Sequence, residues 1–106
     1  MHAFDVPNLL RRQAASGDLY LEFLRIPSLS MGLYVLEARA TDPQQPHAED
    51  EVYVILAGQG MITVGDEERP VEMGSIIFVP AHVPHRFHSI VERLEMLVLF
   101  APAESA

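Results

Sequence analysis

Two short stretches of the chain concentrate histidine and acidic side chains. The first runs Gln-Pro-His-Ala-Glu-Asp-Glu over residues 45–51, and the second runs Pro-Ala-His-Val-Pro-His over residues 80–85. Alternate side chains of an extended segment point to the same face. If the first stretch is extended, Gln45, His47 and Glu51 therefore share one face. His85 shares a face with the apolar Phe87, which favours an interior position.

Two imidazoles and a carboxylate that converge from separate strands form a set of metal ligands with open coordination positions. Such open positions allow a metal to polarise a substrate or to activate oxygen. The carboxamide oxygen of Gln45 is available as a fourth, weaker ligand. The alternative is that these side chains are polar residues at the mouth of a fold, satisfied by their neighbours. A glutamate that faces an apolar interior is costly unless it is paired or coordinated.

The elements that would position these residues are mostly strands. Asp5 to Ser16 is predicted to be a helix, with Asp5 as its cap, Pro7 in its first turn and Gly17 after its end. After Gly17 the apolar residues follow a strand-like period. The predicted strands are Leu19–Ile26, Met31–Ala40, Glu51–Ala57, Met61–Val64, a short run around Val71, Ile76–Val79, His85–Ile90 and Leu94–Phe100. Eight short strands separated by Gly and Pro predict an all-β sandwich or barrel.

Length and charge limit the classes of function. The chain has 106 residues, which predicts one β-domain over 18–106 preceded by the helical segment 1–17. Seven Lys and Arg against 15 Asp and Glu leave a formal charge of −8. Nucleic acid and anionic membrane surfaces require basic surfaces, so both are disfavoured as partners.

The chain contains no cysteine, which excludes disulfides, iron–sulfur clusters and thiol nucleophiles. The first residues show neither the basic nor the apolar region of a signal peptide. The longest apolar run, Met96 to Ala103, is far shorter than the ~18 residues that a membrane span needs. We therefore expect a soluble cytoplasmic protein.

The first stretch resembles a motif of the cupin family, whose form is G-x5-H-x-H-x3,4-E-x6-G. His47 matches the second histidine of the motif, Glu51 matches the glutamate, and Gly58 matches the final glycine. Gln45 stands where the motif has its first histidine. The phrase Glu-Asp-Glu-Val-Tyr-Val-Ile-Leu-Ala-Gly is similar to that of many small single-domain bacterial cupins.

The second stretch resembles the other cupin motif, G-x5-P-x-G-x2-H-x3-N. Gly74, Pro80 and His85 match its glycine, proline and histidine. His82 replaces the second glycine of the motif, and Ser89 replaces its asparagine. Together the two motifs extend the resemblance over nearly the whole chain.

The resemblance implies a jelly-roll barrel with a divalent metal inside it. In this family the motifs supply three His and one Glu, of which His47, Glu51 and His85 carry over. The implied site is a set of two His and one carboxylate, which suits iron, manganese, nickel or zinc. Gln45 either completes this site or marks a weaker affinity for the metal.

Other polar residues near these motifs have less specific interpretations. His82 is expected in an exposed loop, with a proton-transferring role at the barrel mouth as the alternative. His88 is expected to face away from the site, and Arg86 is expected to point outward with it. Glu49 either lies near the metal or belongs to a solvated acidic turn. The side chains expected first as core and second as a pocket wall are Tyr53, Ile55, Phe87, Met96 and Val98.

These observations predict a metal-binding cupin that acts on a small molecule, with dioxygenase-like or isomerase-like chemistry. The alternatives are a non-catalytic small-ligand binder and a structural barrel with a weakened metal site. Fold and family do not choose among them. The strand Leu19–Ile26 is apolar on both faces, which predicts that a second subunit covers it in a homodimer.

Overall fold

The computed structural model describes residues 1–105 and begins with the helix α1, Val6–Ser16. Pro7 lies in its first turn, and Gly17 ends it with a left-handed φ of 76°. Asp5 occupies the N-cap position as predicted, but its side chain makes no capping hydrogen bond. Its backbone carbonyl instead accepts hydrogen bonds from the amides of Asn8 and Leu9, both at 3.1 Å.

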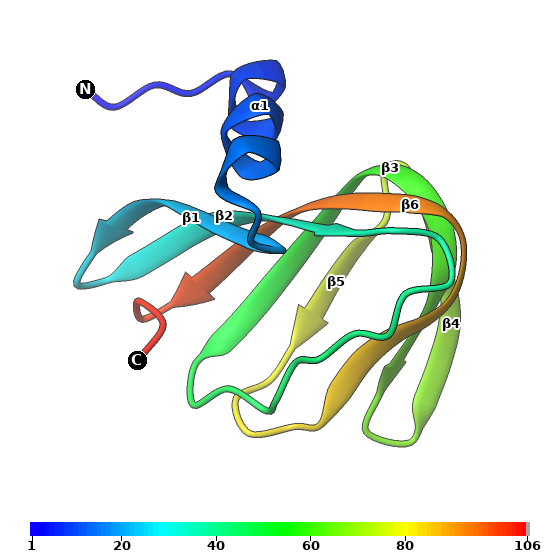
Figure 1. Cartoon of the computed structure of the whole chain (residues 1–106). Coiled ribbons are helices and arrows are strands. Elements are labelled where there is room, and N and C mark those ends of the chain that lie inside the picture. Colours follow the sequence, from blue (N-terminus) through cyan, green and yellow to red (C-terminus); the bar gives the residue numbers. More distant parts are fainter. Residues whose placement is uncertain (106) are drawn as a thin grey trace.

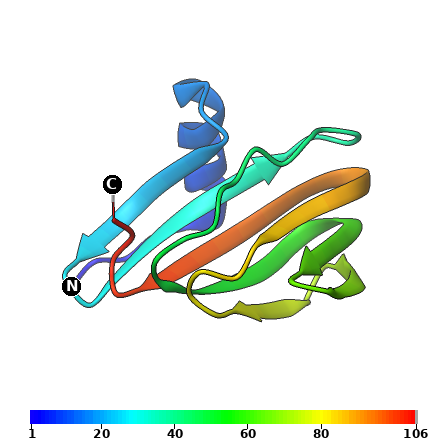
Figure 2. The same cartoon turned by 90° about the horizontal axis from the view of Figure 1, so that it is seen from below.

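Six antiparallel strands follow the helix and curl into a barrel-like sheet (Figures 1 and 2). Their order is β1-β2-β6-β3-β4, and β5 pairs with β3 outside this path. The strands are β1 (Tyr20–Ile26), β2 (Leu29–Leu36), β3 (Asp50–Val64), β4 (Glu67–Glu72), β5 (Ile76–Val79) and β6 (His85–Ala101). This arrangement confirms the predicted all-β fold with one N-terminal helix.

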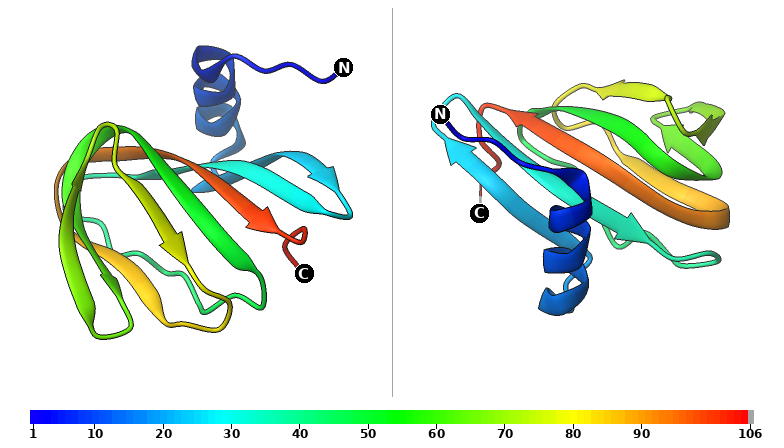
Figure 3. Two further views of the ribbon diagram at one scale, coloured as in Figure 1. Left: turned by 180° about the vertical axis from the view of Figure 1, so that it is seen from behind. Right: turned by 90° about the horizontal axis from the view of Figure 1, so that it is seen from above.

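The eight predicted runs become six strands because β3 and β6 each join two of them. The Gly58-Gln59-Gly60 segment does not end β3; register shifts between Ile55 and Met61 bend the strand there instead. Figure 3 shows both strands bending round the end of the barrel. Gly58 has φ 98°, and a Cβ on it would lie 2.1 Å from the Arg93 carbonyl oxygen. The bend therefore needs glycine at this position.

The second strand differs from its prediction at both ends. It begins at Leu29 and stops at Leu36, whereas the apolar pattern predicted Met31–Ala40. Residues 38 and 39 form a turn, and Arg39 has a positive φ of 65°. Ala38 and Ala40 thus belong to the start of the connection that leads to the histidine-rich stretch.

The interior of the barrel is apolar and closely packed. All five side chains predicted to be core first are buried there, which confirms that interpretation; they are Tyr53, Ile55, Phe87, Met96 and Val98. The helix α1 lies on the outer face of the sheet, where Leu9 packs with Leu33 and Val35 (Figures 1 and 2). No helix among residues 1–105 is long and apolar enough to cross a membrane.

Candidate metal centre

The side chains of His47, Glu51 and His85 meet inside one end of the barrel. Glu51 lies near the start of β3 and His85 begins β6, while His47 lies in the connection from β2, three residues before β3. One potential ligand atom from each residue lies within 4.8 Å of the others. The structure therefore brings together the three residues that both motifs predicted.

Glu51 and His85 form the buried part of this group. Each side chain is only 1% exposed, and His85 Nε2 lies 3.0 Å from Glu51 Oε1. The geometry of this contact is not that of a hydrogen bond. Among residues 1–105, neither carboxylate oxygen of Glu51 nor His85 Nε2 has a hydrogen-bond partner. Buried polar atoms without partners are rare and costly, so these atoms fit a ligand set for a cation.

The charges around His85 affect its proton affinity in opposite directions. Burial has the largest single effect and lowers the pKa of the imidazole. The neighbouring Glu51 carboxylate and the Val83 carbonyl together outweigh burial, and the pKa of His85 is raised above 6.5. His85 Nδ1 lies 2.9 Å from the Val83 carbonyl oxygen, which accepts the ring proton. The remaining nitrogen, Nε2, then faces Glu51.

His47 is held between a carboxylate and an amide. Its Nδ1 lies 3.1 Å from Glu104 Oε2, and its Nε2 lies 3.3 Å from Gln44 Oε1. The ring packs edge-on against Phe100, with centroids 4.8 Å apart. Burial raises the pKa of Glu104, and His47 opposes part of that rise. The backbone also helps to place His47, because its carbonyl accepts a 2.7 Å hydrogen bond from the His82 amide.

The structure does not bring Gln45 into this group. Its side chain is exposed, whereas the preceding Gln44 is partly buried and contacts His47. The expectation for Gln45 assumed an extended segment, but residues 41–47 are not part of a strand. Alternation of faces therefore does not apply before β3.

The other histidines lie outside the group, as expected. His82 is exposed, and its φ of 68° explains why the motif has glycine there. His88 contacts Thr63 at 2.8 Å and Ser89 at 3.0 Å on another face of β6. Arg86 is exposed. These positions confirm the strand parity predicted for residues 85–88.

Glu49 differs from both of its interpretations. Its side chain is buried rather than part of a solvated turn, and it does not belong to the three-residue group. Its Oε2 accepts a 2.9 Å hydrogen bond from the Ser105 hydroxyl. Glu49 therefore ties the segment after β6 to the connection before β3.

A cavity of about 130 Å³ lies beside His47. It is lined by Tyr20, Tyr34, Gln44, His47, Val98, Phe100 and Glu104. Tyr20 enters it because Gly32 on β2 has no side chain; a Cβ there would lie 2.1 Å from the Tyr20 ring. Within residues 1–105 the buried Tyr20 hydroxyl has no hydrogen-bond partner. Its pKa is raised chiefly by burial, so the hydroxyl remains a proton donor at neutral pH.

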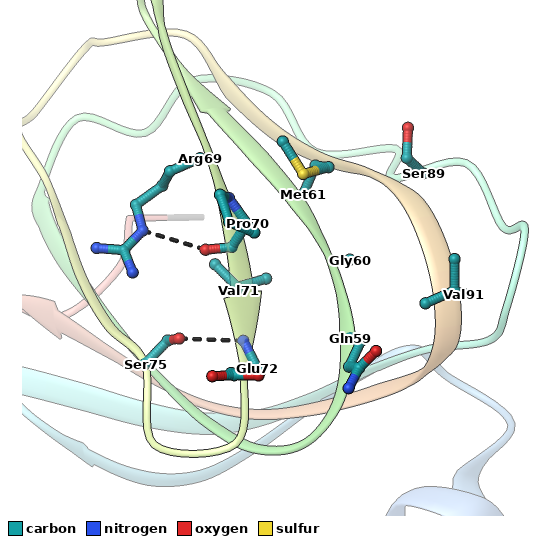
Figure 4. A pocket seen from close by; sticks show the side chains of 10 residues that line it. All are labelled: Gln59, Gly60, Met61, Arg69, Pro70, Val71, Glu72, Ser75, Ser89 and Val91. Atoms are coloured by element: carbon teal, nitrogen blue, oxygen red, sulfur yellow. Dashed lines mark hydrogen bonds between the residues drawn. The ribbon is translucent and has the colours of Figure 1, made fainter.

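A larger hollow of about 450 Å³ lies between β4 and the bent parts of β3 and β6 (Figure 4). It contains none of the three candidate ligands. Two of its polar side chains already have partners, because Arg69 donates to the Pro70 carbonyl and Ser75 accepts from the Glu72 amide (Figure 4). The cavity beside His47 is therefore the better candidate for a ligand site.

The sequence reasoning missed Tyr20, Gln44 and Glu104. Tyr20 and Glu104 come from opposite ends of the chain and meet His47 only through the fold. The one available signal was Gly32, a glycine inside an apolar strand, which indicates close approach of another group. Nothing in the sequence pattern distinguished Gln44 from Gln45.

Comparisons with known proteins agree with this architecture. Residues 32–101 match the cupin domain family. An uncharacterized protein of Streptomyces coelicolor is 50% identical over 105 residues, which cover 99% of this chain and 100% of that protein. The crystal structure of TT1209 from Thermus thermophilus superposes with a TM-score of 0.78 at 25% identity and covers 97% of this chain and 99% of that chain. The crystal structure of BH2720 from Bacillus halodurans superposes with a TM-score of 0.83 at 14% identity and covers 99% of this chain and 83% of that chain.

Proposed function

The chain belongs to the cupin family, and we propose that it holds one divalent transition metal at His47, Glu51 and His85 and acts there on a small molecule. The buried atoms of Glu51 and His85 that lack hydrogen-bond partners carry this proposal. Two imidazoles and one carboxylate suit iron, manganese, nickel or zinc. When bound, such a metal supplies Lewis acidity or a site for oxygen chemistry.

The chain's own residues would prepare these ligands for a cation. The Val83 carbonyl and the Glu104 carboxylate face the Nδ1 atoms of His85 and His47. Partners of this kind fix the tautomer and the orientation of a ligating histidine. Each ring would then offer Nε2, and the apolar barrel around Glu51 would keep bulk water away from the charged group.

The cavity beside His47 is the proposed position of the small molecule. A volume of about 130 Å³ approaches that of apolar cavities that hold benzene, so it suits a compound of about six non-hydrogen atoms. Phe100 and Val98 offer apolar contacts. The Tyr20 hydroxyl offers a buried hydrogen-bond donor without a partner, which suits an acceptor such as a carbonyl or carboxylate oxygen.

The metal content of the protein tests this proposal. Protein purified without chelator should contain about one divalent transition metal per chain by elemental analysis. Sub-stoichiometric metal, together with a melting temperature that chelation does not change, would instead support a non-catalytic barrel with a weakened site. Iron would favour oxygen chemistry, and zinc would favour Lewis-acid chemistry.

We further propose that the protein is cytoplasmic, as expected for a chain without cysteine.

We also propose a homodimer that buries the outer face of the sheet. Two cross-strand rows on this face contain only apolar side chains: Met31, Leu99, Val52 and Phe78 in one, and Leu33, Leu97, Val54 and Ile76 in the other. The cluster around Leu9 of α1 already includes Leu33 and Leu97, so the part of the rows open to a second copy lies towards β5. Phe78 and Ile76 are 59% and 67% exposed. Because each chain has a formal charge of −8, an uncharged face is where two copies can approach with least repulsion.

This surface refines the predicted role of β1. The helix α1 already packs near Leu21 and Phe23, so β1 is partly covered within one chain. Leu19 and Ile26 at the ends of the predicted run remain 43% and 44% exposed. Phe78 and Ile76 on β5 are each more exposed than either of these residues.

A further inference from the structure

Gln44 lies beside His47, in the position that the motif predicted for Gln45. Its Oε1 lies 3.3 Å from His47 Nε2 and accepts a 2.8 Å hydrogen bond from the Tyr53 hydroxyl. Gln44 therefore links a candidate ligand to a buried tyrosine on β3. Gln45, in contrast, is exposed.

The orientation of the Gln44 amide is determined by Asp42. Gln44 Nε2 donates a 2.9 Å hydrogen bond to Asp42 Oδ2, and an ionised carboxylate can only accept. Asp42 is itself buried and is held by the Tyr34 hydroxyl at 2.6 Å and the Phe87 amide at 2.9 Å. The amide nitrogen must therefore face Asp42, which leaves the amide oxygen facing His47.

The partners of the two histidines leave the Nε2 atom of each neutral ring free to accept. Glu104 faces His47 Nδ1 at 3.1 Å, and the Val83 carbonyl faces His85 Nδ1 at 2.9 Å. Both are acceptors, so each neutral ring carries its proton on Nδ1 and its lone pair on Nε2. Gln44 Oε1 and His47 Nε2 are then two acceptors 3.3 Å apart. Two acceptors at this distance repel each other unless a cation or a proton lies between them.

We propose that Gln44 Oε1 is a fourth protein ligand of the metal held by His47, Glu51 and His85. This inference rests on the proposed function, because it concerns the same cation. A neutral carboxamide oxygen is a harder donor than a third imidazole. It therefore shifts the site towards metals that accept oxygen ligands, such as iron(II) or manganese. The Tyr53 hydroxyl and Asp42 serve as positioning groups for this oxygen.

Two substitutions at Gln44 separate ligation from support of the loop. Gln44→Leu removes the amide at similar size, while Gln44→Glu keeps an oxygen but removes the N–H donor to Asp42. Gln45→Leu makes the same change as the first variant at the adjacent exposed position. The probes are zinc, with affinity measured by competition against a chromophoric chelator, and cobalt(II), whose visible absorption reports coordination number and donor set.

We expect Gln44→Leu to weaken zinc binding at least about tenfold and to change the cobalt(II) spectrum. Gln44→Glu should keep the cobalt(II) coordination number of the wild-type protein. Gln45→Leu should change neither the zinc affinity nor the cobalt(II) spectrum. If Gln44 served only to support the loop through Asp42, Gln44→Leu would weaken zinc binding without changing the cobalt(II) coordination number. That result would overturn the proposal.

Other outcomes separate this inference from the proposed function. Stoichiometric zinc binding by the unchanged protein together with unchanged affinity in Gln44→Leu would overturn only the role of Gln44, in favour of a proton between Gln44 and His47. If Gln45→Leu lost as much zinc affinity as Gln44→Leu, or more, Gln45 and not Gln44 would be the fourth ligand. Failure of the unchanged protein to bind zinc or cobalt(II) would overturn the metal site itself and this inference with it.

Discussion

The carboxylate of Glu51 and the imidazole of His85 lie 3.0 Å apart at 1% exposure, although 33 residues of chain separate them. Pairing of β3 with β6 alone would place them far apart, because Val64 opposes His85 and Glu51 opposes Phe100 at the other end of the ladder. The bending of both strands round the barrel brings the two side chains together. The two side chains face each other without an aligned hydrogen bond. This relationship gives the candidate metal centre its buried half.

Replacing His85 should abolish metal uptake. His85→Ala removes the buried imidazole nitrogen that lacks a hydrogen-bond partner, so elemental analysis should find no bound metal. His88→Ala is the matched control, because His88 lies three residues further along β6 and contacts Thr63 instead. Metal loss in both variants to the same extent would show that the effect comes from β6 as a whole and not from this site.

Removing the metal should lower the melting temperature. A cation that binds only the folded chain adds about 2.7 kcal/mol when its free concentration is 100 times Kd. In a domain of this size, each kcal/mol corresponds to a shift of roughly 4–8 °C. Calorimetry before and after chelation should therefore show a loss of about 10 °C or more. A melting temperature that does not respond to chelation would argue for a site with little affinity.

The metal-free protein should lose stability as the pH rises. The pKa of His85 is raised above 6.5 in the folded chain, so the folded state holds this proton more tightly than the unfolded state. Its contribution is therefore fully present below about pH 6.5 and is lost as the pH rises through the higher folded pKa. Urea unfolding in chelator should show this decline, and Glu51→Gln, which removes the neighbouring charge, should reduce it.

Two glycine variants should separate steric overlap from backbone strain. Gly58 and Gly74 have similar φ values of 98° and 93°, but only at Gly58 does an added Cβ meet the backbone, at the Arg93 carbonyl. Gly74→Ala should cost about 1–3 kcal/mol from its left-handed conformation alone. Gly58→Ala should cost distinctly more in urea unfolding. Equal losses would mean that β6 moves aside freely at the bend.

A charge on the outer face should dissociate the proposed homodimer. Phe78→Glu places a carboxylate in the exposed apolar row and should give a monomer mass by solution scattering. Glu68→Gln is a control on an exposed residue of β4 outside the two rows. A monomer mass for the unchanged protein would contradict the proposed interface directly.

Much of this fold could be predicted from the residues alone. Strand-like alternation depends only on local pattern, and it located segments that contribute to all six strands. The even spacing from His85 to Phe87 predicted an interior imidazole correctly, because both residues lie within one strand. The motif spacing likewise identified His47, Glu51 and His85 as residues that meet.

The tertiary structure alone decided which groups surround those three residues. The 41–47 connection is not a strand, so its side-chain directions follow from contacts such as Gln44 with Asp42 and not from alternation. Glu104 and Tyr20 reach His47 from distant segments that the curled sheet brings together. Local sequence determines backbone preference over a few residues, whereas the neighbours of a buried side chain depend on long-range packing that no local pattern encodes.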